Sequence, residues 1–421
     1  MGFMRTPILE TMFWVCVGAL AYHYAGYPLL LFILSVLSQA KSDFLYLVRR
    51  DSRRCPRPSD YVPRVALLLS AYNEEAVIQA KVKNTFAIDY PSARLEFLVG
   101  LDASTDSTAK LLNQIASSRL RVFPFSTRQG KLAVLRALAQ QTSAEILVFT
   151  DANTALEPSC IRNLVRHFRD PRVGAVSGEE TRVVARGTDP AAESLYWRYE
   201  SALKILESRL NCSLGGNGAV LAVRRSVFQP RKQSIVEDFQ IPLEIRFQGY
   251  RVVYDPEAIA IEEVAPTFSA QFARRVRIGA GNYQTLWENP ACLNPLKGLL
   301  TFCFFSHRLL RWLGPWFLLV AFFCSVSLAT KPEFAIFAVA QCFFYALAAV
   351  GYGLKKQGKS ARLLSAPFHF CSMNLALLLG LFVYWKGRQG LTWASTPRQS
   401  RPEGFAVDRA GDGWQDPRVA V

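Results

Sequence analysis

The sequence predicts an α/β domain with a mostly parallel sheet, flanked by transmembrane helices. In the middle of the chain, short apolar runs alternate with stretches of helical periodicity, and the runs are almost continuously apolar. Such strands are typical of a parallel sheet covered by helices on both faces. Long uncharged apolar stretches lie toward the two ends of the chain instead. A chain of 421 residues is also too long for one ordinary core, so we expect more than one folding unit.

The N-terminal apolar stretch, residues 12–38, contains no Asp, Glu, Lys or Arg and is long enough to span a bilayer. A cleaved signal peptide is the alternative, but the stretch is too long and no small-residue cleavage site follows it. Three more apolar stretches lie near the C-terminus, at 312–329, 333–354 and 363–385. Hydrogen bonding between helices, rather than transport, is the expected role of the isolated polar residues in them, Gln341, His369 and Asn374.

The net charge of +16 would suggest nucleic acid in a soluble protein, but much of this charge lies beside the first apolar stretch. The basic residues there are Lys41, Arg49, Arg50, Arg53, Arg54 and Arg57. Clusters of this kind mark the cytoplasmic side of a membrane and favour anionic lipid. A second basic loop contains Lys355, Lys356, Lys359 and Arg362. We therefore expect a protein integral to the cytoplasmic (inner) membrane, with residues 55–295 in the cytoplasm and no nucleic-acid partner.

The side on which the C-terminal tail lies is ambiguous. Counting the membrane helices from a cytoplasmic middle domain places the tail outside. The positive-inside rule favours the cytoplasm instead, because the tail carries Lys386, Arg388, Arg398 and Arg401. The sequence leaves both alternatives open.

The cysteine and histidine content excludes two common kinds of stabilising site. The nine cysteines are scattered without any Cys-x-x-Cys pair, and the four histidines stand far apart. We therefore expect neither a disulfide framework nor a zinc site. The cysteines are predicted to be small buried hydrophobic residues.

The middle of the chain is predicted to contain strands at 65–70, 95–101, 119–125 and 145–150. Helices are predicted at 74–88, 106–117, 129–141 and 158–169. The alternation of strands and helices, together with the apolar stretches at the two ends, divides the chain into five predicted segments. They are a membrane helix with a basic linker (1–54), a cytoplasmic domain (55–265), amphipathic interface helices (266–311), three membrane helices (312–388) and a flexible tail (389–421).

Polar residues follow three of the predicted strands. The segments are SAYNEE (70–75), LDASTDS (101–107) and TDANT (150–154). In open α/β sheets, ligands bind beyond the carboxyl ends of the strands. Each Asp alone could be an ordinary helix N-cap, but three such strand ends in register favour a shared ligand site.

The ligand site lacks both common glycine-rich phosphate cradles, since neither GxxxxGK[ST] nor a GxGxxG after the first strand is present. A hard divalent cation, Mg²⁺ or Mn²⁺, is the alternative, because such ions prefer oxygen ligands and share them with substrate phosphates. Asp151 and Asn153, two residues apart on a turn, could both point toward one metal. Lys131 lies at the start of a predicted helix, where ammonium and helix dipole both favour a phosphate. A plain surface lysine is the alternative for Lys131.

These segments together resemble the family 2 glycosyltransferases, membrane-associated enzymes with a glycosyltransferase A-type, Rossmann-like fold. The resemblance covers roughly residues 60–290. It implies that Tyr72 and Glu74 hold the uracil of a nucleotide sugar and that Asp102 binds the nucleoside. TDANT resembles the family's Asp-x-Asp metal motif, with Asp151 kept and Asn153 in place of the second Asp. Lys131 is expected to contact the donor phosphates.

The acceptor side of the resemblance lies further along the chain. GGNGA (215–219) resembles the segment that lines the acceptor pocket, which implies Gly216, Asn217 and Gly218 in acceptor binding. VED (236–238) resembles the Thr-Glu-Asp catalytic motif and implies Asp238 as the base and Glu237 as its partner in catalysis and acceptor binding. A capping pair for a helix over 238–248 is the alternative for these two carboxylates, although the basic stretch RKQS (231–234) before them suggests a mobile loop.

The last family element departs from its pattern. Polymerising members such as cellulose, hyaluronan and poly-N-acetylglucosamine synthases carry Gln-x-x-Arg-Trp, whereas this chain reads ARRVRIGAGNYQ (273–284). Two alignments place either Arg277 or Arg274 at the motif's Arg, and neither retains the Trp. Arg274 and Arg277 can still bind the donor diphosphate, or can face phospholipid headgroups from an amphipathic surface helix. The missing Trp argues against processive polymerisation.

The segment HRLLRWLGPW (307–316) follows at the start of a predicted membrane helix. We expect its polar and aromatic residues to be anchors at the membrane interface. They are His307, Arg308, Arg311 and Trp312.

The sequence therefore predicts an inverting membrane glycosyltransferase that uses Mg²⁺ or Mn²⁺. It moves a sugar from a nucleotide sugar, most simply a UDP-sugar, to a lipid-linked or polysaccharide acceptor in cell-envelope or exopolysaccharide biosynthesis. A processive polysaccharide synthase is the alternative within the class. A transporter or nucleotide sensor is disfavoured, because the membrane segments lack paired charges and Gly/Pro-interrupted repeats. The identity of the sugar and the oligomeric state are not encoded in any motif.

Overall fold

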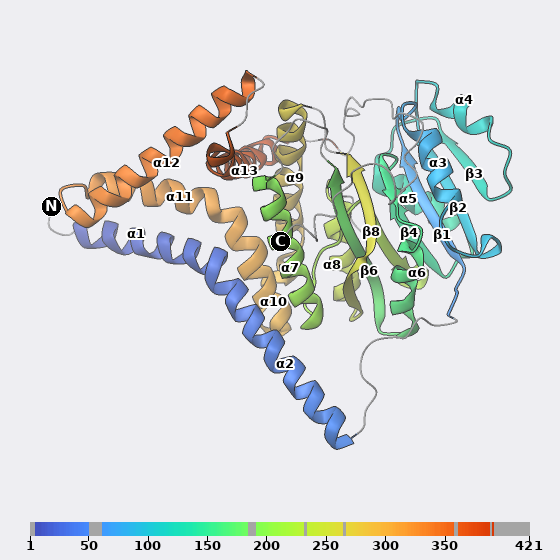
Figure 1. Ribbon diagram of the computed structural model, residues 1–421, viewed down its shortest axis with the longest axis horizontal. Helices are drawn as coiled ribbons and strands as arrows, with labels where there is room; N and C mark the ends of the chain where they lie inside the picture. The colour runs from blue at the N-terminus through green and yellow to red at the C-terminus, as the bar shows by residue number, and fades with distance from the viewer. Residues whose placement is uncertain are drawn as a thin grey trace.

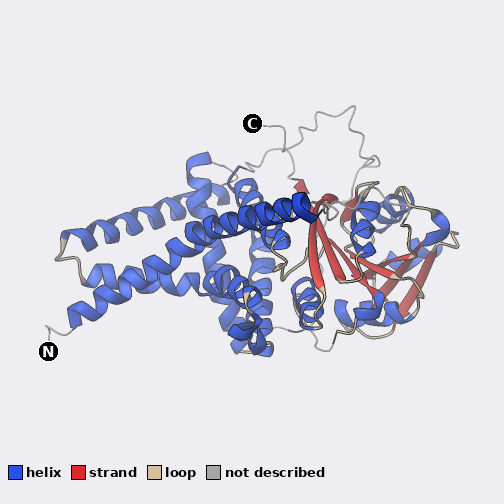
Figure 2. Cartoon of the chain, turned by 90° about the horizontal axis from the view of Figure 1, so that it is seen from below, coloured by secondary structure: helices blue, strands red, loops and turns tan. Residues whose placement is uncertain are grey.

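The computed structural model describes residues 5–49, 61–183, 191–230, 234–263, 267–357, 361–387 and 390. An α/β domain lies at one side of the molecule, and long helices extend away from it at the other (Figure 1). Figure 2 shows the same division, with the strands gathered in one half and helices alone in the other. Most of the basic residues predicted beside the first membrane helix, and residues 231–233 of the predicted mobile loop, lie outside the described residues.

The sheet has eight strands in the order β3-β2-β1-β4-β7-β6-β8-β5. Strands β3, β2, β1 and β4 are parallel neighbours, as are β6 and β8. Strand β7 runs antiparallel to β4 and β6, and β5 runs antiparallel to β8. The mostly parallel sheet is therefore confirmed, with an antiparallel insertion that was not predicted. The strands are β1 (Val65–Ala71), β2 (Leu95–Asp102), β3 (Leu120–Phe125), β4 (Ile146–Thr150), β5 (Thr154–Leu156), β6 (Val173–Val183), β7 (Val220–Arg224) and β8 (Arg251–Glu263).

Helices cover both faces of the sheet, which explains its continuously apolar strands. Leu67 of β1 packs with α3 and α6, whereas its neighbour Leu68 faces α5 on the other side. Helix α5 approaches β2 so closely that a Cβ on Gly100 would lie 2.3 Å from Val134 Cγ1. The helices of this domain are α3 (Ile78–Phe86), α4 (Thr108–Asn113), α5 (Lys131–Gln140), α6 (Cys160–Val165), α7 (Ala191–Arg209) and α8 (Glu237–Phe247).

The first predicted helix, 74–88, begins later than expected because the residues after β1 form a bonded turn. The Asn73 side chain accepts from Thr105 N at 2.8 Å, and Glu75 accepts from Ser107 N at 2.9 Å. Asn73 itself has a φ of +53°, a left-handed conformation that asparagine tolerates better than most residues. The chain therefore cannot enter the helix until this turn is complete, and α3 starts at Ile78.

Within the described part of the chain, four helices are long and apolar enough to cross a membrane, which agrees with the predicted number. The first, Thr6–Leu45, is longer than the predicted 12–38 and includes a π-helical bend. Phe13 of α1 packs against Ala321 and Cys324 of α11, so the first and second spans lie side by side. The elements are α1 (Arg5–Ala21), η1 (Tyr22–Gly26), α2 (Tyr27–Arg49), α10 (Leu299–Cys303), η7 (Phe304–Leu309), α11 (Leu310–Ser327), α12 (Pro332–Lys356) and α13 (Arg362–Trp385).

Helices α7 and α9 (Phe268–Glu288) lie between the sheet and the membrane-length helices (Figure 1). Small residues allow α9 to approach its neighbours on two sides. A Cβ on Gly380 of α13 would lie 2.8 Å from the backbone N of Ala280, and a Cβ on Gly281 would lie 2.8 Å from Val236 Cγ1. Helix α9 therefore connects the membrane helices with the segment that leads into α8.

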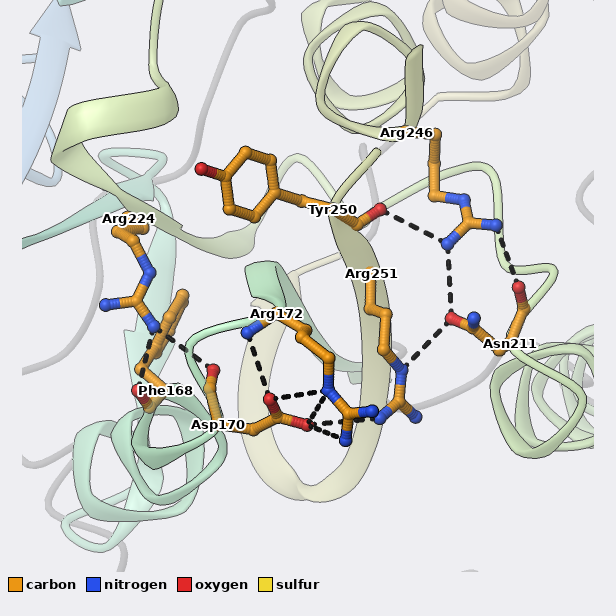
Figure 3. A network of polar contacts seen from close by, with 8 residues as sticks. All are labelled: Phe168, Asp170, Arg172, Asn211, Arg224, Arg246, Tyr250 and Arg251. Atoms are coloured by element: carbon orange, nitrogen blue, oxygen red, sulfur yellow. Dashed lines mark hydrogen bonds and ion pairs between the residues drawn. The ribbon is translucent and has the colours of Figure 1, made fainter. Parts of the chain in front are cut away.

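A polar network holds the C-terminal end of α7 against the starts of β6 and β8 (Figure 3). The Asn211 side chain accepts from Arg246 and from Arg251, both at 3.1 Å. Asp170 accepts from Arg172 at 2.9 Å and from Arg251 at 3.3 Å. These bonds fix the position of the C-terminal end of α7 relative to the sheet.

Candidate active site

The segments that follow β1 and β2 at their carboxyl ends are bonded to each other. Ala71 pairs with Leu101 in the parallel register, so the segments that follow, 72–75 and 102–107, lie side by side. They are joined by the bonds of the Asn73 turn and by a bond from Glu74 N to Thr108 Oγ1 at 2.9 Å. The Glu74 side chain is buried at this edge. Two of the three predicted strand ends are thus brought together.

Asp102 holds the loop that leads into α5. Its carboxylate accepts from Gln129 N at 2.7 Å and from Gly130 N at 3.1 Å. Gly130 has a φ of +87°, which a residue with a side chain rarely adopts. Arg128 in the same loop lies 3.5 Å over the ring of Tyr72. The predicted base-binding and nucleoside-binding residues therefore form one connected surface.

Lys131 joins the end of β4 to the start of α8. Its Nζ lies 2.6 Å from Asp151 Oδ1 and 2.5 Å from Glu237 Oε1. Burial alone would lower the pKa of Lys131, but the two carboxylates outweigh it and raise the pKa above its usual range. The lysine is therefore a fixed positive charge. The alternative of a plain surface lysine is wrong, since only 13% of its side chain is exposed.

Asn153 and Arg274 meet at a residue that sequence reasoning missed, Glu262 of β8. The Asn153 amide donates to Glu262 Oε1 at 3.0 Å. Arg274 contacts both oxygens of the same carboxylate, at 2.8 and 3.4 Å. Glu262 raises the pKa of Arg274 further above its usual range. The signal available in the sequence was the pair of carboxylates closing the apolar run AIAIEE (258–263), the same pattern that singled out Asp151.

Asp238 lies against the glycine segment, by which we mean residues 215–218. Gly216 N donates to Asp238 O at 2.8 Å, and a Cβ on Gly218 would lie 3.5 Å from Asp238 Oδ2. Burial and the charge of Glu237 raise the pKa of Asp238 to about 6, while Lys131 opposes the shift. A carboxylate with this pKa can take a proton at neutral pH.

Arg277 is half-buried on α9, one turn beyond Arg274. Burial lowers its pKa, an effect that the charge of Glu237 opposes. It also lies within electrostatic range of Asp151 and Asp238. Its α9 neighbour Gln284 accepts from Ile235 N at 3.2 Å, just before the two carboxylates of α8. Helix α9 therefore brings positive charge to the same place as the carboxylates.

Asn217 is placed at the predicted acceptor segment, but its side chain is used within the protein. Its amide donates to Gly178 O at 2.5 Å, its backbone N donates to Ser177 Oγ at 2.8 Å, and its Oδ1 accepts from Lys204 at 2.5 Å. Only 6% of the residue is exposed. These contacts make Asn217 a residue that positions the glycine segment.

The predicted metal site offers two hard oxygen donors, the Asp151 carboxylate and the Asn153 amide. Among the described residues, no group of three or more His, Cys, Asp and Glu side chains is arranged to hold a metal ion. Two protein oxygens suit a cation that takes its other ligands from a diphosphate and water, as Mg²⁺ commonly does. The residues present therefore fit Mg²⁺ or Mn²⁺ bound together with a nucleotide.

Two of the four residues predicted as anchors at the membrane interface are buried in the structure, and the other two are partly exposed. His307 and Trp312 are 1% and 2% exposed. His307 Nδ1 lies 2.6 Å from Glu207 Oε1, and Arg311 donates to Glu200 Oε1 at 2.5 Å. The anchor interpretation is wrong for His307, Arg311 and Trp312, because their side chains contact Glu207 and Glu200 of α7 and Phe239 of α8. The sequence pattern of residues 307–316 could not show that Glu200 and Glu207 of α7 would be their partners in the fold.

A mixed α/β sheet whose strand ends gather carboxylates, joined to membrane-length helices, defines a glycosyltransferase with the A-type fold. The chain belongs to glycosyltransferase family 2, because the sequence model described as "Glycosyltransferase like family 2" matches residues 63–281.

The chain is also similar to two curated relatives and to one solved structure. It is 26% identical over 324 residues to beta-monoglucosyldiacylglycerol synthase of Synechocystis sp., covering 74% of this chain and 66% of that protein. It is 24% identical over 275 residues to poly-beta-1,6-N-acetyl-D-glucosamine synthase of Staphylococcus aureus, covering 62% and 65%. The chain thus spans slightly less than two thirds of each relative. Mannosyltransferase PcManGT from Pyrobaculum calidifontis, solved with GDP-Man and Mn²⁺, has the same fold, with a TM-score of 0.68 at 22% identity over 90% of this chain and 100% of that one.

Proposed function

We propose that this chain is an inverting membrane glycosyltransferase that adds one sugar from a UDP-sugar to a lipid-linked or polysaccharide acceptor at the cytoplasmic face of the inner membrane. The observation that carries the proposal is Asp238. It lies against the glycine segment, has a pKa raised to about 6, and is linked through Glu237 and Lys131 to Asp151 at the strand ends. A base and a phosphate-directed cation are thus neighbours.

The acceptor hydroxyl is deprotonated by Asp238 as it attacks. Its oxygen forms a bond to the anomeric carbon while the bond to the diphosphate breaks on the opposite face, which inverts the configuration. The proton moves to a carboxylate oxygen of Asp238 and later to water. Because the pKa of Asp238 is about 6, the carboxylate is ionised at neutral pH and is still basic enough to accept the proton.

The leaving diphosphate is met by positive charge. Lys131 is held by two carboxylates, so its position is fixed before the reaction begins. Arg277 of α9 interacts electrostatically with both Glu237 and Asp151. Preorganised charges of this kind stabilise the transition state without any reorganisation cost. Asp151 and Asn153 would hold Mg²⁺ or Mn²⁺, which when bound neutralises charge on the diphosphate.

Donor recognition is assigned to the joined ends of β1 and β2. Tyr72 and Glu74 are proposed to hold the uracil and Asp102 to bind the nucleoside, as the family resemblance implies. Their positions are fixed by the Asn73 turn and by the loop that Asp102 holds. Gly216, Gly218 and Glu237 are assigned to the acceptor.

Single addition is favoured over polymerisation because neither alignment of the Gln-x-x-Arg-Trp motif retains the Trp, whose position is occupied by Ile278 in one alignment and by Arg275 in the other. Ile278 is 36% exposed on α9 and offers no ring for a sugar to stack on. A processive synthase is the second candidate, which the similarity to the staphylococcal synthase favours.

The proposal is tested with the purified full chain in lipid nanodiscs. Each nucleotide sugar is supplied in radiolabelled form, one at a time, with Mg²⁺ or Mn²⁺. We expect one UDP-sugar to give a lipid-extractable product extended by a single residue. A ladder or a high-mass product would establish the processive alternative, and no transfer from any donor would contradict both.

A further inference from the structure

A cluster of charged side chains lies on the membrane side of the glycine segment, and the mechanism above does not use it. Glu207 of α7 accepts from Tyr27 Oη at 2.7 Å and lies 2.6 Å from His307 Nδ1. Glu200, two helical turns earlier, accepts from Arg311 at 2.5 Å and lies 3.6 Å from His307 Nε2. Each carboxylate is therefore matched with a basic side chain from the membrane helices.

Arg308 is the exception in this cluster. It makes no ion pair or hydrogen bond with the described residues, and its Nε is buried without a hydrogen-bond partner. A buried guanidinium N–H without an acceptor is costly to maintain. Its described neighbours include the ring of Phe239, 5.3 Å from Cζ, and Gly215, where an added Cβ would lie 3.2 Å from Nη2. Its charge also acts on Glu200, although the two side chains form no ion pair. Packing thus holds the side chain in place while its Nε has no acceptor.

The position of Arg308 connects it to the proposed base. Gly215 begins the glycine segment, whose other end, Gly218, lies against Asp238, and Phe239 follows Asp238 in α8. Gly215, beside Arg308, is followed by Gly216, whose backbone N donates to Asp238 O at 2.8 Å. The guanidinium and Asp238 therefore contact adjacent residues of the glycine segment. Arg308 also belongs to a membrane-length span, Leu299–Ser327.

We propose that Arg308 is a phosphate-binding residue for the acceptor, which is then a membrane lipid carrying a phosphate next to the hydroxyl that receives the sugar. This inference rests on the proposed function, since it uses Asp238 as the neighbouring base. The planar guanidinium fork matches the geometry of a phosphate. Gly215 agrees with this assignment, because a Cβ there would lie 3.2 Å from Nη2 and the guanidinium would have to shift to accommodate it.

The test compares two short-chain lipids that both carry free hydroxyls. Dioctanoyl phosphatidylglycerol has a phosphate and dioctanoylglycerol has none. Equilibrium binding of each, and of UDP, is measured for the full chain in neutral detergent. Arg308→Gln is compared with Arg308→Lys, which retains the charge, and with Arg169→Gln, which removes an exposed arginine at the end of the 3-10 helix η3 (Arg166–Arg169).

We expect the native chain to bind the phosphate lipid at least about tenfold more tightly than the neutral lipid. Arg308→Gln should reduce this preference to less than threefold and Arg308→Lys should retain part of it, while UDP affinity stays within twofold as evidence of an intact fold. An equal loss for both lipids, a parallel loss of UDP affinity, or no loss would overturn the assignment. Arg308-dependent binding of inorganic phosphate as tight as that of the lipid would do so too, in favour of a free-phosphate site.

The binding assay needs no turnover, so its failure is distinct from failure of the proposed function. The latter would appear as an absence of sugar transfer by the native chain from every nucleotide sugar. If transfer is found, Arg308→Gln should raise the acceptor KM about tenfold or more and leave the donor KM unchanged.

Discussion

Two groups of ion pairs flank the glycine segment, and they differ in how far water reaches them. At the strand ends, the side chains of Lys131, Asp151 and Glu237 are 13%, 26% and 12% exposed. On the membrane side, those of His307 and Glu207 are 1% and 2% exposed. Both groups pair carboxylates with basic side chains, but only the first is exposed enough for a ligand to reach it. We therefore regard the first group as part of the proposed active site. The second group, which we call the buried joint, holds the membrane helices to the α/β domain.

The largest expected effect is on the buried joint. Glu207→Leu should remove about 3–5 kcal/mol from the free energy of unfolding, because it leaves His307 and Tyr27 without their shared acceptor. Thermal unfolding in detergent measures the change. Tyr27→Phe is the matched control, since it removes one hydrogen bond and should cost about 1 kcal/mol. Equal losses of stability in the two variants would mean that the His307–Glu207 ion pair contributes nothing to stability.

Lys131→Met should act on catalysis rather than on folding. Loss of a fixed cation beside the leaving diphosphate should lower the transfer rate by about 10²–10³-fold. The rate is measured under donor and acceptor saturation, with Lys110→Met, an exposed lysine of α4, as the control. A loss of thermal stability as large as that of Glu207→Leu, or an unchanged rate, would place Lys131 in the structural group instead.

The pH dependence of transfer should report the pKa of Asp238. The proposed base is active when ionised, and its pKa is raised to about 6. The acceptor kcat/KM should therefore fall as pH decreases through about 6, approaching tenfold per pH unit below it. Glu237→Gln removes the neighbouring negative charge, so it should move this acidic limb to lower pH. Movement to higher pH, or none, would contradict the electrostatic role of Glu237.

The smallest expected effect concerns the metal. Asn153→Asp would place a carboxylate beside Glu262, with which Asn153 now forms a hydrogen bond. The two negative charges should destabilise the variant without metal and strengthen its affinity for Mn²⁺. The increase in Tm on adding Mn²⁺ with UDP should therefore be larger than for the native chain. An equal or smaller increase would argue that residue 153 does not ligate the metal.

The sequence predicted much of this fold because its signals are local. Continuous apolar runs located β1, β2, β3 and β4 to within about a residue, and the uncharged stretches located the membrane-length helices. It also predicted the polar ends of β1 and β2 that the structure brings together, Asp102 among them, and the end of β4, where Asp151 pairs with Lys131. Parallel strands place such ends at one edge, so the inference needs no knowledge of packing.

The features that escaped prediction depend on contacts between distant segments. Glu262 bonds to Asn153 across 109 residues, and Glu207 pairs with His307 across 100. No periodicity marks such partners, so His307 was taken for an interfacial anchor and Glu262 was not singled out. Asn217 was predicted to bind the acceptor, but its side chain is bonded to Gly178 and Lys204, contacts that only the fold reveals.

The most direct test of the account is Asp238→Asn. The substitution keeps the size of the side chain and removes its ability to accept the proton, and Glu244→Gln on the same helix is the control. UDP-sugar affinity and the transfer rate are measured on the same preparations. The account predicts a dissociation constant within about threefold of the native value and a transfer rate at least about 10³-fold lower. Transfer within tenfold of the native rate would contradict it.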